Sequence, residues 1–149
     1  MISNPPSGRL LNTNEITADL RVAKITTLRL FHSGKIPGKR RKGGQWCSYE
    51  PDYLSFLIFA GLPAGYAQRL RICSGPWLML PVEVAAGLGI SKMTLYRLVW
   101  ENRIGALRIM VNESRPQYRF PHFEFDNYLR KTGLTDLAAP EAAIAASDE

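Results

Sequence analysis

The sequence has little of what stabilises secreted or membrane proteins. Only two of its 149 residues are cysteines, Cys47 and Cys73, which is too few for a disulfide scaffold and fits a reducing cytoplasm. The longest apolar runs, residues 56–60 and 77–80, are far shorter than the ~20 residues of a membrane-spanning helix. The first eleven residues are polar and lack the charged start and apolar middle of a signal peptide. We therefore expect a cytoplasmic protein without a membrane segment.

Motifs for catalysis and cofactor binding are also missing. We find no glycine-rich phosphate loop, no paired catalytic carboxylates and no nucleophile elbow. Cys47 and Cys73 belong to no CxxC motif, and His122 has no ligand partner near it in the sequence, so zinc is not expected. Free, buried thiols are the default interpretation of both cysteines. We expect no metal, no cofactor and no enzymatic activity.

Positive charge is in excess and is unevenly distributed. The chain has 19 Lys and Arg against 13 Asp and Glu, which gives a net charge of +6. Residues 132–149 carry −4, so the rest of the chain carries +10. Such a charge is compatible with nucleic acid as a partner but does not require it. The densest cluster is a run of four cations ahead of Gly43-Gly44, namely Lys39, Arg40, Arg41 and Lys42.

The chain resembles itself at an offset of 68 residues. Residues 13–40 align with residues 81–108 without a gap, and nine of the 28 pairs are identical. After a four-residue length difference the match resumes at an offset of 72, where Trp46 aligns with Tyr118. The same apolar spacing on both sides of one loop indicates two copies of a module of about fifty residues.

The second copy shows a clear series of element boundaries. Pro81 opens a predicted helix that Gly89 ends, and Ser91 caps the next helix. Two extended stretches, residues 104–111 and 117–120, then flank a polar loop and predict a hairpin. A last helix is expected at about residues 123–130.

The first copy predicts the same order of elements. Helices are expected at residues 15–20 and 24–32, with Gly34 ending the second, and a hairpin follows with Gly43-Gly44 at its tip. A closing helix begins near Pro51. We divide the chain into an N-terminal segment (1–10), a first module (11–57), an apolar, partly helical connector (58–79), a second module (80–131) and an acidic tail (132–149) without stable structure.

These motifs resemble one family of DNA-binding domains. Residues 81–91 followed by 94–98 resemble the excisionase and MerR-type winged helix-turn-helix domain, and residues 33–37, 44–46 and 52–57 carry the resemblance in the first copy. The resemblance implies a mainly α fold with small β-hairpin wings (α+β), as two tandem winged helix-turn-helix domains. The chain departs from the family at residues 19–21, where Leu-Gly is usual, and at Asn102 and Gly105, where Gly and Pro are favoured.

The resemblance implies double-stranded DNA as the partner. The expected function is that of a bacterial or phage-encoded recombination directionality factor or transcriptional regulator of a mobile element, with a recombinase or RNA polymerase as a protein partner. We expect the protein to be a monomer or to self-associate weakly on DNA. We expect it to bind two short motifs about 10 bp apart. The alternative is an assembly or adaptor protein of the phage-packaging or plasmid-partition type, in which the second module contacts protein.

The candidate DNA contacts lie on the second helix of each module and on the wings. By resemblance to excisionases, Arg29 and Arg97 contact bases, whereas Lys24 and Lys92 contact phosphates. Thr26 and Thr94 are left open between DNA contact and helix capping or packing. The candidates on the helices are Lys24, Ile25, Thr26, Arg29, His32, Lys92, Met93, Thr94, Tyr96 and Arg97. Those on the wings are Lys39, Arg40, Arg41, Lys42, Arg108 and Arg115.

Four aromatic side chains complete the candidate sites. Trp46 and Tyr118 follow the two wings at matching positions, and we expect them to pack the hairpins onto the helices. His32 and Trp100 end the second helix of each module, where either a phosphate contact or a contact with the wing is open.

Overall fold

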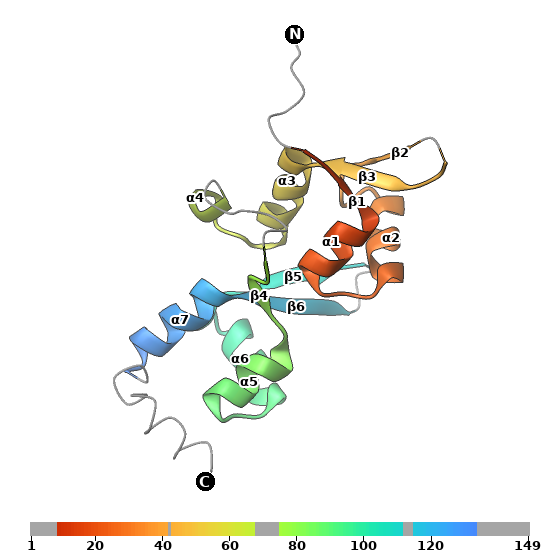
Figure 1. Ribbon diagram of the computed structural model, residues 1–149. Coiled ribbons are helices and arrows are strands. Elements are labelled where there is room, and N and C mark those ends of the chain that lie inside the picture. Colours follow the sequence, from red (N-terminus) through yellow and green to blue (C-terminus); the bar gives the residue numbers. More distant parts are fainter. Residues whose placement is uncertain (1–8, 42, 68–74, 112–114, 134–149) are drawn as a thin grey trace. The chain divides into compact units, whose positions relative to one another are not determined.

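The computed structural model describes residues 9–41, 43–67, 75–111 and 115–133 (Figure 1). Lys42, Cys73 and nearly all of the predicted acidic tail lie outside these residues. The chain divides into two compact units, a first of residues 1–76 with 108–117 and a second of residues 77–107 with 118–149. The described residues form seven helices and two small three-stranded sheets, a mixed arrangement consistent with the predicted α+β class.

The first unit places two short helices before a hairpin and a longer helix after it. Its sheet has the order β1-β3-β2, and both pairs are antiparallel, with Leu10 opposite Tyr49 and Arg40 opposite Trp46. Its elements are β1 (Leu10–Asn12), α1 (Thr13–Leu20), α2 (Lys24–His32), β2 (Lys39–Arg40), β3 (Trp46–Tyr49), α3 (Glu50–Ala60) and α4 (Ala64–Ala67).

The second unit has its elements in a similar order. Its sheet has the order β4-β6-β5, with Leu78 opposite Pro121 and Met79 opposite Phe120. The division by contacts crosses the β5–β6 hairpin, since residues 108–117 are grouped with the first unit. The elements after residue 76 are β4 (Leu78–Met79), α5 (Pro81–Leu88), α6 (Lys92–Trp100), β5 (Leu107–Met110), β6 (Pro116–Pro121) and α7 (His122–Lys131), of which most of β5 and the start of β6 are grouped with the first unit.

The predicted connector contains ordered elements at both ends. Residues 58–60 are the last residues of α3, which continues until Gly61 because no proline or glycine follows Pro51 of its first turn. Leu78 and Met79 form β4 and pair with β6. A strand of two residues has no alternation for the sequence to show, and its partners are about forty positions away. The predicted helix at residues 63–72 is described only as α4.

The helix starts follow from side-chain capping. Asn12 Oδ1 accepts from the backbone N–H of Glu15 at 2.8 Å, and Glu15 Oε1 accepts from that of Asn12 at 2.9 Å. This capping box explains why α1 begins at Thr13 rather than at Glu15. In the second unit Ser91 Oγ accepts from the backbone N–H of Thr94 at 3.1 Å, which confirms the predicted cap of α6.

The first helix of each unit ends in the left-handed region. Gly89 follows α5 with φ 71°, as predicted. Arg21 follows α1 with φ 57°, so a residue with a Cβ adopts a conformation that favours glycine. The departure at residues 19–21 therefore leaves the geometry of the turn intact.

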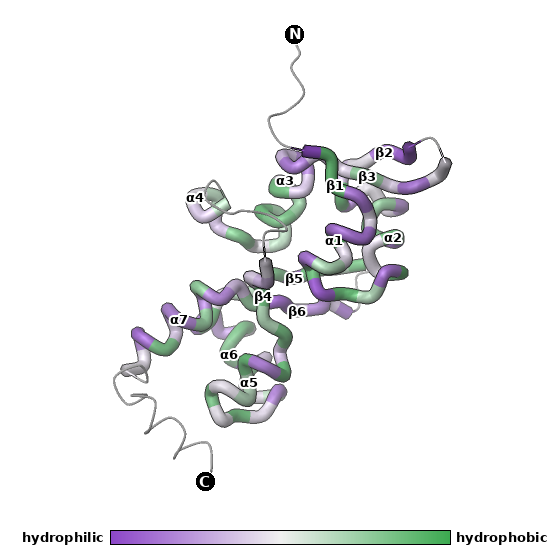
Figure 2. Tube along the Cα trace, in the orientation of Figure 1, coloured by the Kyte–Doolittle hydropathy of each residue, from purple (hydrophilic) through white to green (hydrophobic). Residues whose placement is uncertain are grey.

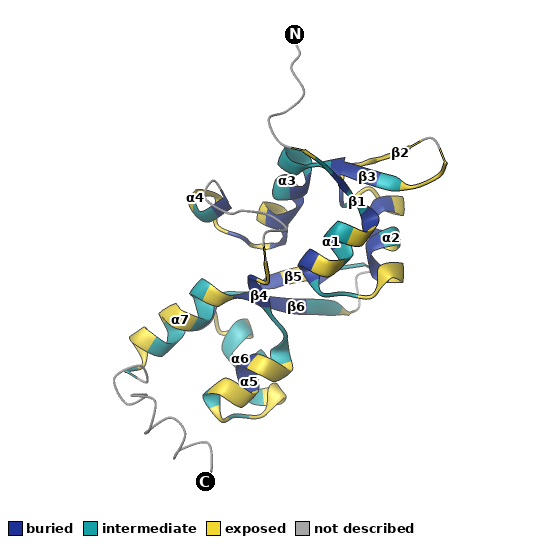
Figure 3. Cartoon of the chain, in the orientation of Figure 1, coloured by how far each residue is buried: buried dark blue, intermediate teal, exposed yellow. Residues whose placement is uncertain are grey.

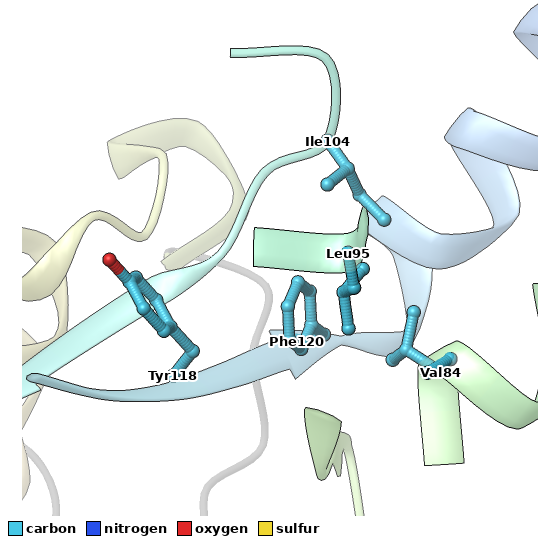
Figure 4. Packing of buried hydrophobic residues seen from close by; sticks show 6 residues of the cluster. Val84, Leu95, Ile104, Tyr118 and Phe120 are labelled. Carbon is cyan, nitrogen blue, oxygen red and sulfur yellow. The ribbon is translucent and has the colours of Figure 1, made fainter. Parts of the chain in front are cut away.

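Each unit has its own apolar core (Figures 3 and 4). In the second unit Val84 and Leu95 of the two helices meet Phe120 and Tyr118 of β6, with Ile104 closing the cluster (Figure 4). In the first unit the core contains a polar pair, in which the Tyr53 hydroxyl donates to Asp19 Oδ2 at 2.6 Å. The fully buried apolar side chains of the first unit include Leu11, Ile16, Leu20, Leu30, Ile36, Cys47 and Leu57.

Candidate nucleic-acid interface

α2 presents a basic and partly apolar face to solvent. Lys24, Ile25, Arg29 and His32 are exposed, and 53% of the Ile25 side chain is accessible. At about 100° per residue, Ile25, Arg29 and His32 lie within about 60° of arc on the helix. Within the described part of the chain, Lys24 and Arg29 form no ion pair. Their charges are therefore available to an anionic partner.

Two threonines of α2 face the core instead. Thr26 is 7% exposed and Thr27 is fully buried, although the sequence placed Thr26 at the edge of the DNA-binding face. The Thr17 hydroxyl donates to Thr27 Oγ1 at 2.7 Å, so this buried hydroxyl has a partner. Of the two interpretations left open for Thr26, the structure supports packing. The buried set of α2 is Thr26, Thr27, Leu30 and Phe31.

α6 has the same arrangement of exposed residues in the second unit. Lys92, Met93 and Arg97 are exposed, and 62% of the Met93 side chain is accessible. Tyr96 is half-buried on the same face. Thr94 is half-buried, and its hydroxyl lies 3.0 Å from the capping Ser91 hydroxyl. Capping is therefore the role that the structure supports for Thr94.

In each unit an aromatic side chain links the hairpin to the helix before it. The Trp46 ring stacks on Phe31 with the centroids 5.4 Å apart, and its centroid lies 5.3 Å from that of His32, edge to face. The Tyr118 hydroxyl accepts from Trp100 Nε1 at 3.2 Å. The predicted packing role of Trp46 and Tyr118 is confirmed, and of the two interpretations of His32 and Trp100 the structure shows the contact with the wing.

The first wing consists of β2, β3 and the loop between them, residues 39–49. Its tip turns through Gly43 (φ 99°) and Gly44 (φ 90°), a conformation that side chains with a Cβ rarely adopt. The backbone N–H of Arg41 donates to Gln45 O at 2.7 Å, which closes the loop. The cations Lys39, Arg40 and Arg41 are all exposed, and β2 is a hydrophilic segment (Figures 2 and 3).

Two of these cations form cation–π contacts with aromatic rings of the same wing. The Arg40 guanidinium lies 5.9 Å from the Trp46 ring centroid, and the Lys39 ammonium lies 5.2 Å from that of Tyr49. Sequence reasoning did not single out Tyr49. Lys39 pairs with Cys47 across the hairpin, and Tyr49 lies two residues after Cys47 on the same strand. Lys39 and Tyr49 are therefore diagonal neighbours on one face of the sheet, and the hairpin register is the signal that could have identified Tyr49.

The second wing consists of β5, β6 and the loop between them, residues 107–121. Arg108 and Arg115 are exposed, as expected for DNA contacts. The wing therefore presents two candidate cations, compared with three described and a fourth, Lys42, in the sequence of the first wing.

The described residues were also compared with the requirements of a metal site and of a membrane span. Within the described ranges, no three His, Cys, Asp or Glu side chains group as metal ligands. Among the same residues, no helix is both long enough and apolar enough to cross a membrane.

Comparison with known families identifies one of these regions. Residues 81–133 match the model of a family described as a helix-turn-helix domain. The match spans α5, α6, the second wing and α7, about a third of the chain. No curated protein and no solved structure matches the chain. The match indicates a DNA-binding regulatory protein, with residues 81–133 as its helix-turn-helix domain.

Proposed function

We propose that the chain is an excisionase-like regulatory or architectural protein that binds double-stranded DNA with both α2 and α6. The observation that carries the proposal is the repeated arrangement on these two helices. Each begins with an exposed lysine, Lys24 or Lys92, and carries an exposed arginine five positions later, Arg29 or Arg97. Each is followed by a hairpin whose aromatic residue contacts the end of the helix.

The proposal assigns different roles to these cations. Arg29 and Arg97 donate paired hydrogen bonds to guanine, and each such pair discriminates against a wrong base by about 1–3 kcal/mol. Lys24, Lys92 and the wing cations contact phosphates and fix the orientation of the protein without specifying sequence. The glycine tip of the first wing suits a narrow minor groove, where the negative potential is strongest.

Two excisionase-like modules in one chain bind two DNA segments. The shared order of helices and strands and the matching strand order of the two sheets support a duplication. Linked modules raise each other's effective concentration, so the pair binds more tightly than either module. The expected biological roles are recombination directionality or transcriptional control in a mobile element, with a recombinase or RNA polymerase as a partner.

Binding to random duplexes across a salt titration tests the proposal. We expect measurable binding at low salt that weakens steeply as salt rises. Arg29→Ala and Arg97→Ala should reduce the preference for a selected site more than the affinity for random duplex. Absence of binding at low salt, or binding insensitive to salt, contradicts the proposal.

A second candidate is an assembly or adaptor protein whose second module contacts protein. It is favoured by the exposed apolar side chains of that module, since Val82, Met93 and Trp100 are 57%, 62% and 63% accessible. Light scattering separates the candidates, because a stable large oligomer without DNA supports assembly and a monomer supports DNA binding.

A further inference from the structure

The second residue of both α2 and α6 is a large apolar side chain in solvent. Ile25 is 53% accessible and Met93 is 62% accessible. Both helices have a buried stripe elsewhere, with Leu30 in one core and Leu95 in the other, so neither exposed side chain is needed to fill a core. A single exposed apolar side chain is ordinary on a protein surface, and the observation that points to a common partner is its recurrence at the same position of two helices.

The surroundings of Ile25 and Met93 favour an anionic partner. Each lies between a lysine one residue earlier and an arginine four residues later, and neither helix contains an acidic residue. A protein interface normally loses charged residues at its centre, whereas the surface of a DNA groove is flanked by phosphates. The combination of an apolar centre and basic flanks therefore fits a major groove.

The polar side chains in the first turn of each helix that could otherwise contact a base, Thr26 and Thr94, have partners within the protein or are buried. Thr26 is buried in the first core, and the backbone N–H and hydroxyl of Thr94 both face the capping Ser91. The side chains left in solvent at the N-terminal turn are the lysines and the two apolar residues. In the major groove the apolar group at a base edge is the C5-methyl of thymine.

We propose that Ile25 and Met93 each contact the C5-methyl group of a thymine, and so select a T·A pair at one position in each bound segment. This inference rests on the proposed function, because it requires both helices to lie in the major groove. Burying one methyl group changes an association constant by about fourfold. Two such contacts change it by about fifteenfold if they act independently.

Uracil substitution tests the contact directly. A duplex selected from a random pool with the full chain is prepared again with uracil for thymine, first throughout and then one position at a time. Uracil keeps the base pair and lacks only the methyl group. Fluorescence anisotropy measures the binding. We expect the fully substituted duplex to bind about fifteenfold more weakly. In each segment, we expect a single uracil at one particular position to weaken binding about fourfold.

Matched variants assign each methyl to its side chain. With Ile25→Ala the penalty should vanish at one position, and with Met93→Ala at the other, while the remaining penalty persists. Phe59→Ala removes a side chain that is 81% accessible on α3, and it should leave both penalties unchanged. Since all three side chains are exposed, the variants should fold, and thermal unfolding by circular dichroism checks this.

The outcomes separate the inference from the function on which it rests. If the chain binds no duplex at low salt, the proposed function fails. If it binds but uracil has no effect, or the uracil penalty survives in both alanine variants, the methyl contact is wrong. If Ile25→Ala or Met93→Ala dissolves an oligomer and leaves the uracil penalty intact, the side chain contacts protein and the inference is overturned.

Discussion

The indole Nε1 of Trp100, at the end of α6, donates a hydrogen bond of 3.2 Å to the hydroxyl of Tyr118 on β6. In the first unit the corresponding contact is between two rings, since His32 at the end of α2 meets Trp46 of β3 edge to face with the centroids 5.3 Å apart. In both units the last residue of the helix touches the strand that returns from the wing. Each contact joins the returning strand to the end of the helix within one unit.

Tyr118→Phe should lower the free energy of unfolding by about 0.5–1.5 kcal/mol, because the indole N–H loses its acceptor while the ring packing remains. Urea denaturation measures the loss. Tyr96→Phe is the matched control, since the Tyr96 ring lies 5.5 Å from that of Tyr118 and its hydroxyl makes no hydrogen bond to a described residue. Equal losses in the two variants would show that the hydrogen bond contributes nothing specific.

Tyr53→Phe should cost more than Tyr118→Phe. The Tyr53 hydroxyl donates at 2.6 Å to Asp19, and Tyr53 is fully buried while Asp19 is 8% exposed. A hydrogen bond to a charged group contributes about 1.5–3 kcal/mol, and its loss removes one donor from a buried carboxylate. A double-mutant cycle with Asp19→Asn should give a coupling above 1 kcal/mol, well beyond what separate sites show. Additive losses would mean that the two groups act independently.

The sequence predicts the elements of this chain well where local chemistry determines them. Pro81, Gly89 and Ser91 mark the bounds of α5 and the start of α6 without reference to the rest of the fold, and all three predictions are confirmed. The Gly43-Gly44 hairpin tip is confirmed for the same reason. The length of α3 was not predicted, since the helix passes the predicted module end at residue 57 and ends before Gly61.

The candidate site could be predicted only in part. Helical periodicity correctly places Arg29 and Arg97 in solvent, since charge and period agree. Periodicity does not decide the place of Thr26, which is buried beside Thr27, because a β-branched polar residue suits a core position once its hydroxyl has a partner, as Thr27 has in Thr17. The strands β1 and β4 were invisible for a different reason, namely that their pairing partners are remote in sequence.

Arg21→Gly should stabilise the first unit by about 0.5–1 kcal/mol. Arg21 adopts φ 57°, which costs a residue with a Cβ about 1–2 kcal/mol. Glycine removes this cost, but its greater freedom in the unfolded chain offsets part of the stabilisation. Gly89→Ala is the reverse experiment at φ 71°, where a Cβ meets no atom within 4 Å. It should destabilise by about 0.5–1 kcal/mol, because the same backbone strain is partly offset by the smaller freedom of alanine in the unfolded chain. A neutral Gly89→Ala would refute strain as the cause.

Glu15 should make stability fall with acid. The backbone N–H of Asn12 donates to its carboxylate and, with Arg9, holds the pKa of Glu15 below its usual 4.5, against an opposing effect of burial. A carboxyl with a lower pKa in the folded state stabilises above the unfolded pKa, and this is lost as the pH falls through the folded pKa. The melting-temperature deficit of Glu15→Gln should be full at pH 7 and should shrink below about pH 4.5.

Glu124 provides the control of opposite sign. Burial raises the pKa of Glu124 above its usual 4.5, although Lys131 acts in the other direction. A carboxyl with a raised folded pKa destabilises when ionised, so Glu124→Gln should raise the melting temperature at pH 7. That gain should fade as the pH falls through the pKa of Glu124. If both Gln variants shift the melting temperature in the same direction at pH 7, the assignments are wrong.

The two wings should differ in their share of the salt dependence of DNA binding. Each phosphate neutralised in a duplex contributes about −0.9 to the slope of log K against log salt concentration. Replacing the exposed cations Lys39, Arg40 and Arg41 by alanine should therefore flatten the slope by up to about 2.7, compared with at most about 1.8 for Arg108 and Arg115. Arg103→Ala is the control, since the Arg103 guanidinium already lies 3.4 Å from Glu101 and belongs to neither wing. A slope that changes equally for both wings would contradict the prediction that the first wing contacts more phosphates than the second.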